Sequence, residues 1–168
     1  MGPSPGWTCS EFGCNELAAN VSSCAIRASD GMTGGQRPRV LLVDDHREIL
    51  VAVQRLLTPT CEIVGAVDCG RLAIETASVL RPDVVVLDLN MPQVSGLDVC
   101  RDLVRCLPAV RVVILTAMAD EWTEAEAYRL GASAFVRKIE MAERLPSIIQ
   151  QLFEDETPST FASSDQPH

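Results

Sequence analysis

The strongest constraint on the fold is segment 84–88, in which four consecutive apolar residues are followed directly by Asp88. Three of the four apolar residues are valines, a composition typical of a strand that is buried on both faces of a parallel sheet. Pro92 and Gly96 follow closely, so we expect a loop after this strand. Asp88 is therefore predicted to lie at the carboxyl end of a central strand, where open α/β sheets bind ligands.

Short apolar runs alternate with amphipathic stretches on either side of this segment. The apolar runs predict four further strands, at 40–43, 63–67, 111–115 and 134–137. Apolar residues spaced three and four positions apart predict helices at 49–57, 70–80, 97–107, 120–130 and 141–152. Five strands that alternate with five helices predict an α/β fold, in which a doubly wound parallel sheet is covered by helices on both faces.

The alternating pattern covers residues 38–153 and leaves room for one domain. Residues 1–37 have no sustained periodicity, so we expect a disordered N-terminal extension. Residues 154–168 carry four acidic residues and neither lysine nor arginine, and we expect a disordered acidic tail.

Composition excludes several classes of partner. The net charge of -9 argues against a nucleic-acid-binding surface, which needs clustered lysine and arginine, and against binding to an anionic membrane. No signal peptide or membrane-spanning run is present, so we expect a cytoplasmic protein. Four of the seven cysteines lie in or near apolar segments and are expected to be buried, reduced thiols: Cys61, Cys69, Cys100 and Cys106.

Polar side chains stand at the carboxyl ends of four predicted strands: Asp44 and Asp45, Asp88, Thr116 and Lys138. Parallel strands bring these ends to one edge of the sheet, where the carboxylates would repel one another. Mg²⁺ relieves such repulsion because it prefers hard oxygen ligands. Lys138, the only lysine among fourteen basic residues, would add a fixed cation. A metal, a cation and a nucleophilic carboxylate are the parts that aspartyl-phosphate chemistry requires.

The same residues resemble the receiver domain of bacterial two-component response regulators. The resemblance covers residues 38–153 and implies a flavodoxin-like sheet of order 2-1-3-4-5 with five helices. It implies a signalling protein in a phosphorelay and not an enzyme. It rests on the acidic pair Asp44-Asp45, on Asp88-Leu89-Asn90-Met91-Pro92 with Gly96, on Thr116-Ala117, and on Phe135 three residues before Lys138.

The resemblance also implies individual roles in phosphoryl transfer. Asp88 would accept the phosphoryl group from a sensor histidine kinase or a phosphotransfer protein. Mg²⁺ would be held by Asp44, Asp45 and Asp88 together with the backbone carbonyl of Asn90. Lys138 would pair with the phosphoryl oxygens.

Further implied roles concern signalling. Thr116 and Phe135 would be the switch residues, with Thr116 moving toward the phosphoryl group and Phe135 rotating inward. The surface of the fourth helix, fifth strand and fifth helix would contact a downstream protein. Trp122, on that fourth helix, is either a partner-binding anchor or a packed edge residue. The domain would be a monomer or a phosphorylation-dependent homodimer.

One residue near the site departs from the family pattern, and another points to a subfamily. Receiver domains usually have proline after the lysine, often in a cis peptide, whereas here Ile139 follows, so we expect a trans bond. The run Asp44-Asp45-His46 resembles the subfamily that usually carries a DNA-binding helix-turn-helix, so the chain is a stand-alone receiver or a fragment. His46 itself is interpreted as a surface or capping histidine without a metal-ligand partner at useful spacing.

Simpler interpretations exist for each residue alone. An aspartate pair after a strand often caps a helix, and an isolated lysine is usually a solvated surface residue. A phosphohydrolase of the haloacid dehalogenase type is an alternative. Such enzymes need a second aspartate two residues after the nucleophile, but this chain has asparagine at position 90. A degenerate receiver that binds partners without phosphorylation is disfavoured by the intact Asp88, Thr116 and Lys138.

Overall fold

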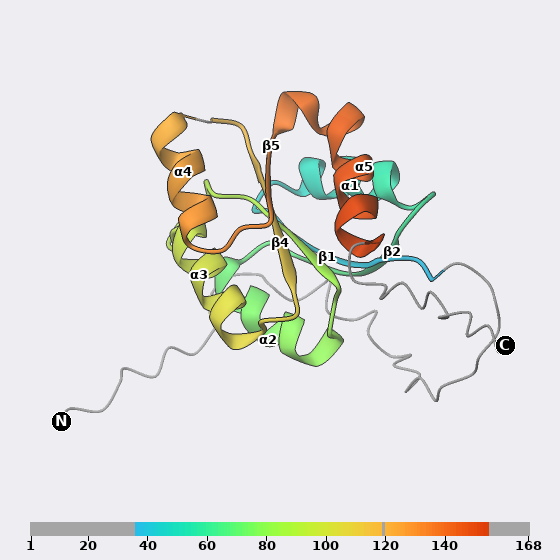
Figure 1. Cartoon of the computed structure of the whole chain (residues 1–168), viewed down its shortest axis with the longest axis horizontal. Coiled ribbons are helices and arrows are strands. Elements are labelled where there is room, and N and C mark those ends of the chain that lie inside the picture. Colours follow the sequence, from blue (N-terminus) through green and yellow to red (C-terminus); the bar gives the residue numbers. More distant parts are fainter. Residues whose placement is uncertain (1–35, 119, 155–168) are drawn as a thin grey trace, which may run out of the picture.

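The computed structural model describes residues 36–118 and 120–154, which form a parallel sheet between two layers of helices (Figure 1). The strands are β1 (Arg39–Val43), β2 (Glu62–Val67), β3 (Val84–Leu87), β4 (Arg111–Thr116) and β5 (Ala134–Arg137). The helices are α1 (Arg47–Leu57), α2 (Gly70–Leu80), α3 (Gly96–Cys106), α4 (Glu121–Arg129) and α5 (Met141–Glu154), with a short 3-10 turn, η2 (Lys138–Glu140), before α5.

The strand order is β2-β1-β3-β4-β5, and all neighbouring strands pair in parallel. This confirms the predicted order and the predicted number of strands and helices. The chain runs outward from β1 to β2 and then crosses to β3 on the other side of β1. The loops that follow β1 and β3 therefore diverge, and they leave a crevice at the carboxyl edge of the sheet, which is where doubly wound folds bind ligands.

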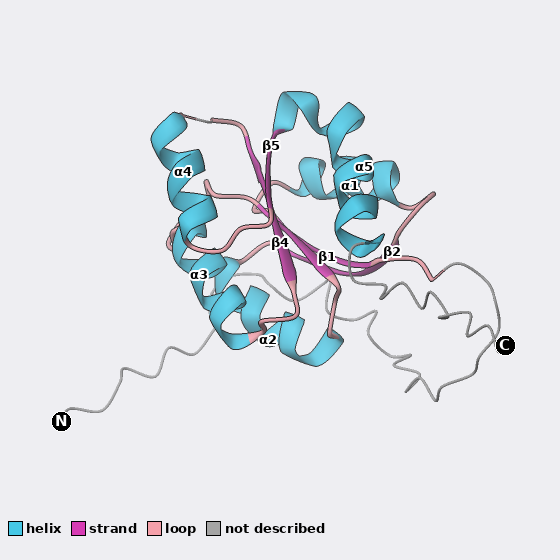
Figure 2. Ribbon diagram, in the orientation of Figure 1, coloured by secondary structure: helices cyan, strands magenta, loops and turns pink. Residues whose placement is uncertain are grey.

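Alternate residues of the strands point to opposite faces of the sheet, and each face is covered by its own set of helices. Leu41 and Val43 of β1 belong to a core shared with α2, α3 and α4. Val40 and Leu42 belong to a second core shared with α1 and α5. All four residues of β3 are buried, as expected for a central strand covered on both faces. Figure 2 shows the strands as a central layer with helices on either side.

Asp120 and Gly131 set the ends of α4 close to their predicted positions. The Asp120 side chain accepts a hydrogen bond from the Thr123 backbone N–H at 2.8 Å and so caps the first turn. Gly131 adopts a φ of 102°, which an L side chain rarely tolerates, and the helix ends before it.

The expected trans bond before Ile139 is confirmed, because residues 36–118 and 120–154 contain no cis peptide.

One expectation about the thiols is wrong. Cys61 and Cys100 are buried as predicted, and burial raises the pKa of the Cys100 thiol to about 11. Cys69, before α2, is only half-buried, and Cys106 is exposed. Cys106 is the last residue of α3, and Leu107, which follows it, packs against the core instead.

The ends of the chain lie mostly outside the described residues. Of the predicted extension and tail, only residues 36, 37 and 154 are described, and residue 154 is the last of α5. No helix in the described part of the chain is long and apolar enough to span a membrane.

Candidate functional site

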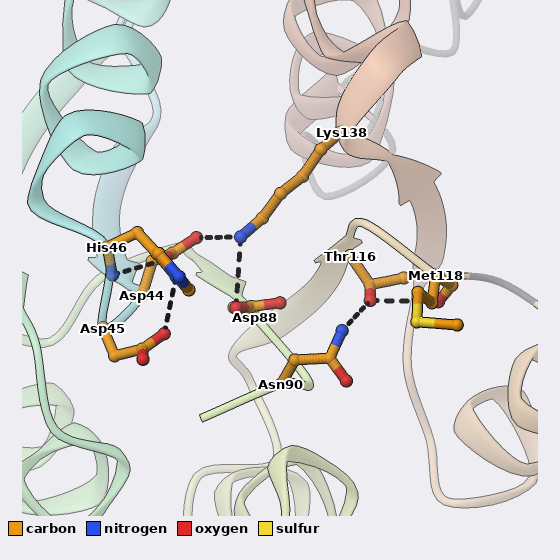
Figure 3. Close-up of polar contacts among 8 residues, drawn as sticks. All are labelled: Asp44, Asp45, His46, Asp88, Asn90, Thr116, Met118 and Lys138. Atoms are coloured by element: carbon orange, nitrogen blue, oxygen red, sulfur yellow. Dashed lines mark hydrogen bonds and ion pairs between the residues drawn. The ribbon is translucent and has the colours of Figure 1, made fainter. Parts of the chain in front are cut away.

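Side chains from four strand ends meet at the carboxyl edge of the sheet (Figure 3). The Lys138 Nζ lies 2.6 Å from Asp44 Oδ2 and 3.1 Å from Asp88 Oδ2. Lys138 follows β5, Asp44 follows β1 and Asp88 follows β3, so these contacts join three strands that are distant in the sequence. The structure therefore brings Asp44, Asp88 and Lys138 together as the sequence predicted.

Both carboxylates of this ion-paired group are buried. Asp44 is 4% exposed and Asp88 is 1% exposed, while the Lys138 side chain is 12% exposed. Burial of the ammonium lowers the pKa of Lys138, but hydrogen bonds and charge attraction from Asp44 and Asp88 outweigh it and raise the pKa above its usual value. Lys138 is thus held as a cation beside Asp88.

His46 contributes an imidazole next to the acidic pair. Its Nδ1 lies 2.8 Å from Asp45 Oδ1 and 3.3 Å from Asp44 Oδ1. The residue occupies the position before α1 and its side chain is 61% exposed, so the interpretation as a surface or capping histidine is confirmed. The interpretation that it has no metal-ligand partner is wrong, because one ligand atom each from Asp44, Asp45, His46 and Asp88 lies within 4.8 Å of the others. The position of His46 directly after the two aspartates was the sequence feature that could have predicted this grouping.

One carboxylate oxygen of Asp88 accepts no hydrogen bond from the described residues. Its backbone N–H donates to the Val43 carbonyl at 2.9 Å, which fixes the residue beside β1. Lys138 contacts Oδ2, whereas Oδ1 is buried without a hydrogen-bond partner among the described residues. A buried carboxylate oxygen without a partner is costly unless a ligand satisfies it. Three clustered carboxylates that offer hard oxygen atoms fit a divalent cation such as Mg²⁺.

Thr116 lies on the opposite side of Asp88 from the acidic pair (Figure 3). It is the last residue of β4 and is 0% exposed. Its hydroxyl donates to the Met118 carbonyl at 3.0 Å and accepts from the Asn90 side-chain amide at 3.1 Å. The contact of the Asn90 side chain with Thr116 was not predicted from the sequence.

The two remaining residues of interest lie away from the ion-paired group. Phe135 of β5 is 5% exposed and lies in the core shared with α2, α3 and α4, whereas Trp122 of α4 is 71% exposed. The alternative of a packed edge residue therefore does not hold for Trp122 in this structure. Its exposed ring is available to a partner.

Comparison with known proteins identifies the family. The family model described as "Response regulator receiver domain" matches residues 40–150, which is most of the chain. The chain belongs to the response regulator receiver domain family. Its sheet order is the one that the sequence resemblance implied.

Relatives of this receiver domain differ in how much of their own length the match covers. The response regulator GacA of Pseudomonas aeruginosa is 32% identical over 117 residues, which are 68% of this chain and 55% of GacA. The chemotaxis protein CheY of Thermotoga maritima is 31% identical over 101 residues, which are 60% of this chain and 84% of CheY. The chain spans about half the length of GacA and of several other regulators that it matches.

Solved structures agree with this assignment. The response regulator domain of Thermotoga maritima CheB superposes with a TM-score of 0.66 at 26% identity, covering 71% of this chain and 98% of that domain. The comparisons therefore show a receiver domain of the kind found in two-component response regulators.

Proposed function

We propose that Asp88 accepts a phosphoryl group from a phosphohistidine of a sensor kinase or phosphotransfer protein, in a reaction that depends on Mg²⁺. One observation carries the proposal: Asp88 is 1% exposed, its Oδ2 is paired with Lys138, and its Oδ1 has no hydrogen-bond partner among the described residues. Desolvation leaves that oxygen poised to accept a ligand or attack an electrophile.

Lys138 and Asp88 would perform the transfer as a pair. With Oδ2 held by Lys138, Oδ1 attacks the phosphorus of the phosphohistidine. The new O–P bond forms as the P–N bond breaks, and the electron pair of that bond stays on the imidazole nitrogen of the donor. The Lys138 ammonium then pairs with an oxygen of the transferred group, which stabilises its charge.

Asp44, Asp45 and Asp88, together with the backbone carbonyl of Asn90, would hold the metal ion. When bound, Mg²⁺ supplies positive charge that offsets the repulsion between the carboxylates and the phosphoryl oxygens. Asp44 also contacts Lys138, so it links the two sources of positive charge.

The phosphorylated domain would signal through a shift between two arrangements of Thr116 and Phe135. A downstream protein would contact the surface formed by α4, β5 and α5, with the exposed Trp122 as an anchor. We further propose that residues 38–153 form the receiver domain in the cytoplasm. The domain would act as a monomer or as a phosphorylation-dependent homodimer, without direct binding to nucleic acid.

Incubation with acetyl phosphate and Mg²⁺, followed by intact mass spectrometry, tests the proposed chemistry. We expect one phosphoryl group per chain that is lost on treatment with hydroxylamine and fails to form when EDTA removes the metal. Asp88→Asn should abolish the adduct. Asp98→Asn is a matched control, because Asp98 is an exposed aspartate on α3 that pairs with Arg101.

Two outcomes would refute the proposal. One is the absence of an adduct on the wild type, and the other is an equal adduct on Asp88→Asn. Steady turnover of a generic phosphate ester would instead favour the phosphohydrolase alternative, in which Asp88 is the nucleophile of a catalytic cycle.

A further inference from the structure

The hydroxyl of Thr116 has both of its hydrogen-bonding functions occupied. Its single proton is donated to the Met118 carbonyl at 3.0 Å, and its oxygen accepts a proton from Asn90 Nδ2 at 3.1 Å. Thr116 is 0% exposed, so water has no access that would replace either bond. The orientation of this hydroxyl is therefore set by two neighbours, one of which is a side chain (Figure 3).

We propose that Asn90 is a positioning residue that holds the Thr116 hydroxyl on the Met118 carbonyl in the unphosphorylated domain. It thereby sets how readily the domain adopts its phosphorylated arrangement. This inference rests on the proposed function of Asp88 as phosphoacceptor.

The Thr116 hydroxyl cannot donate to the Met118 carbonyl and to a phosphoryl group at the same time. A hydroxyl has one proton to donate, and a phosphoryl oxygen on Asp88 can only accept. Thr116 can therefore contact the phosphoryl group as a donor only after it releases the Met118 carbonyl. The bond from the Asn90 amide adds to the stability of the resting arrangement, because it holds the Thr116 oxygen at the position from which the hydroxyl donates to Met118.

Breaking the two hydrogen bonds of Thr116 costs little free energy at Asn90 and Met118. Asn90 and Met118 are both exposed, so water can satisfy the amide and the carbonyl once Thr116 leaves. The buried hydroxyl, in contrast, moves only when a new acceptor is available, since a buried hydroxyl without a partner is costly. Asn90 should therefore shift the equilibrium by the modest net value of one hydrogen bond, and loss of its side chain should favour the phosphorylated arrangement.

Affinity for beryllofluoride in the presence of Mg²⁺ measures this equilibrium without hydrolysis. This anion mimics a phosphoryl group on a carboxylate, and its binding can be followed by isothermal titration calorimetry. We expect Asn90→Ala to bind beryllofluoride about fivefold more tightly than the wild type, because the competent arrangement is more populated. The backbone carbonyl of residue 90 is retained in this variant. A direct contact of the Asn90 amide with the phosphoryl group would give the opposite sign.

A double-mutant cycle separates positioning from a general structural effect. In a Thr116→Ala background there is no hydroxyl to hold, so adding Asn90→Ala should change the affinity by less than about twofold. In a Thr116→Ser background the hydroxyl is retained, and the gain should return. Gln150→Ala serves as a control, since it removes an amide-to-carbonyl bond of 3.2 Å to Thr60 at the amino edge of the sheet.

Unchanged or weaker binding by Asn90→Ala in the otherwise wild-type chain would overturn the role of Asn90. So would an equal gain in the Thr116→Ala background. These results leave phosphorylation of Asp88 intact and are distinguishable from failure of the proposed function. In the latter case the wild type itself would bind no beryllofluoride and take no phosphoryl group, and both proposals would fall.

Discussion

Gly96 packs directly against the backbone that carries the phosphoacceptor. A Cβ atom at this position would lie 2.4 Å from Leu89 Cα and 2.6 Å from the carbonyl oxygen of Asp88. Carbon atoms in contact are normally about 3.5–4.0 Å apart, so Gly96→Ala requires the backbone on one side to move by about 1 Å. Neither obstructing atom is part of a side chain that could rotate away.

The expected cost follows from that geometry. Overpacking in a dense interior typically costs about 1–3 kcal/mol, and a clash with backbone belongs in the upper half of that range. We therefore expect Gly96→Ala to lower the free energy of unfolding by about 2–3 kcal/mol. A domain with a typical stability of about 5–15 kcal/mol remains folded after such a loss, so its chemistry can still be measured. A displacement of about 1 Å at Asp88 should slow phosphorylation by up to about 100-fold.

Gly70→Ala is a matched control for this experiment. Gly70 is also the first residue of its helix, and its nearest obstruction is Met91 Cε at 2.9 Å, the end of a flexible side chain. We expect this variant to lose less than about 1 kcal/mol, because methionine readily repacks. Urea denaturation and the rate of labelling by acetyl phosphate measure both effects. The reasoning fails if Gly96→Ala matches Gly70→Ala in stability and in labelling rate.

Two further substitutions test the loop after β3 and the metal site. Gln93 has a φ of 72°, so Gln93→Gly should relieve left-handed strain of about 1–2 kcal/mol, partly offset by the greater freedom of glycine in the unfolded chain. The net gain, about 0.5–1 kcal/mol, is measurable by urea denaturation, and a loss of stability would contradict it. Mg²⁺ at 100-fold above its Kd should stabilise the wild type by about 2.7 kcal/mol. Asp45→Asn should remove most of this gain, and an equal gain would exclude Asp45 as a ligand.

The fold and the ion-paired group were predictable because each depends on a pattern that is local in the sequence. Four apolar residues before Asp88 indicate a central strand, and parallel pairing necessarily brings the strand ends to one edge. The contacts of Lys138 with Asp44 and Asp88 follow from that topology. The end of α4, shortly before Gly131, likewise depends on one residue that tolerates positive φ.

The features that the sequence could not predict depend on side-chain orientation. The Asn90 amide reaches Thr116 from a loop whose course no periodicity describes. The approach of His46 to Asp45 depends on the rotamer of an exposed side chain. Exposure of Cys106, in contrast, was predictable, because Leu107 and not Cys106 continues the helical spacing of Cys100, Leu103 and Val104, which pack in or against the core.

The most direct test of the central claim is to locate the phosphoryl group by peptide mass spectrometry after reduction with borohydride. Reduction converts an aspartyl phosphate to homoserine and so marks the modified position permanently. After labelling with acetyl phosphate and Mg²⁺, we expect homoserine at position 88 and intact aspartate at positions 44 and 45. Homoserine at either member of the acidic pair, or at no aspartate, would contradict the assignment of Asp88 as the phosphoacceptor.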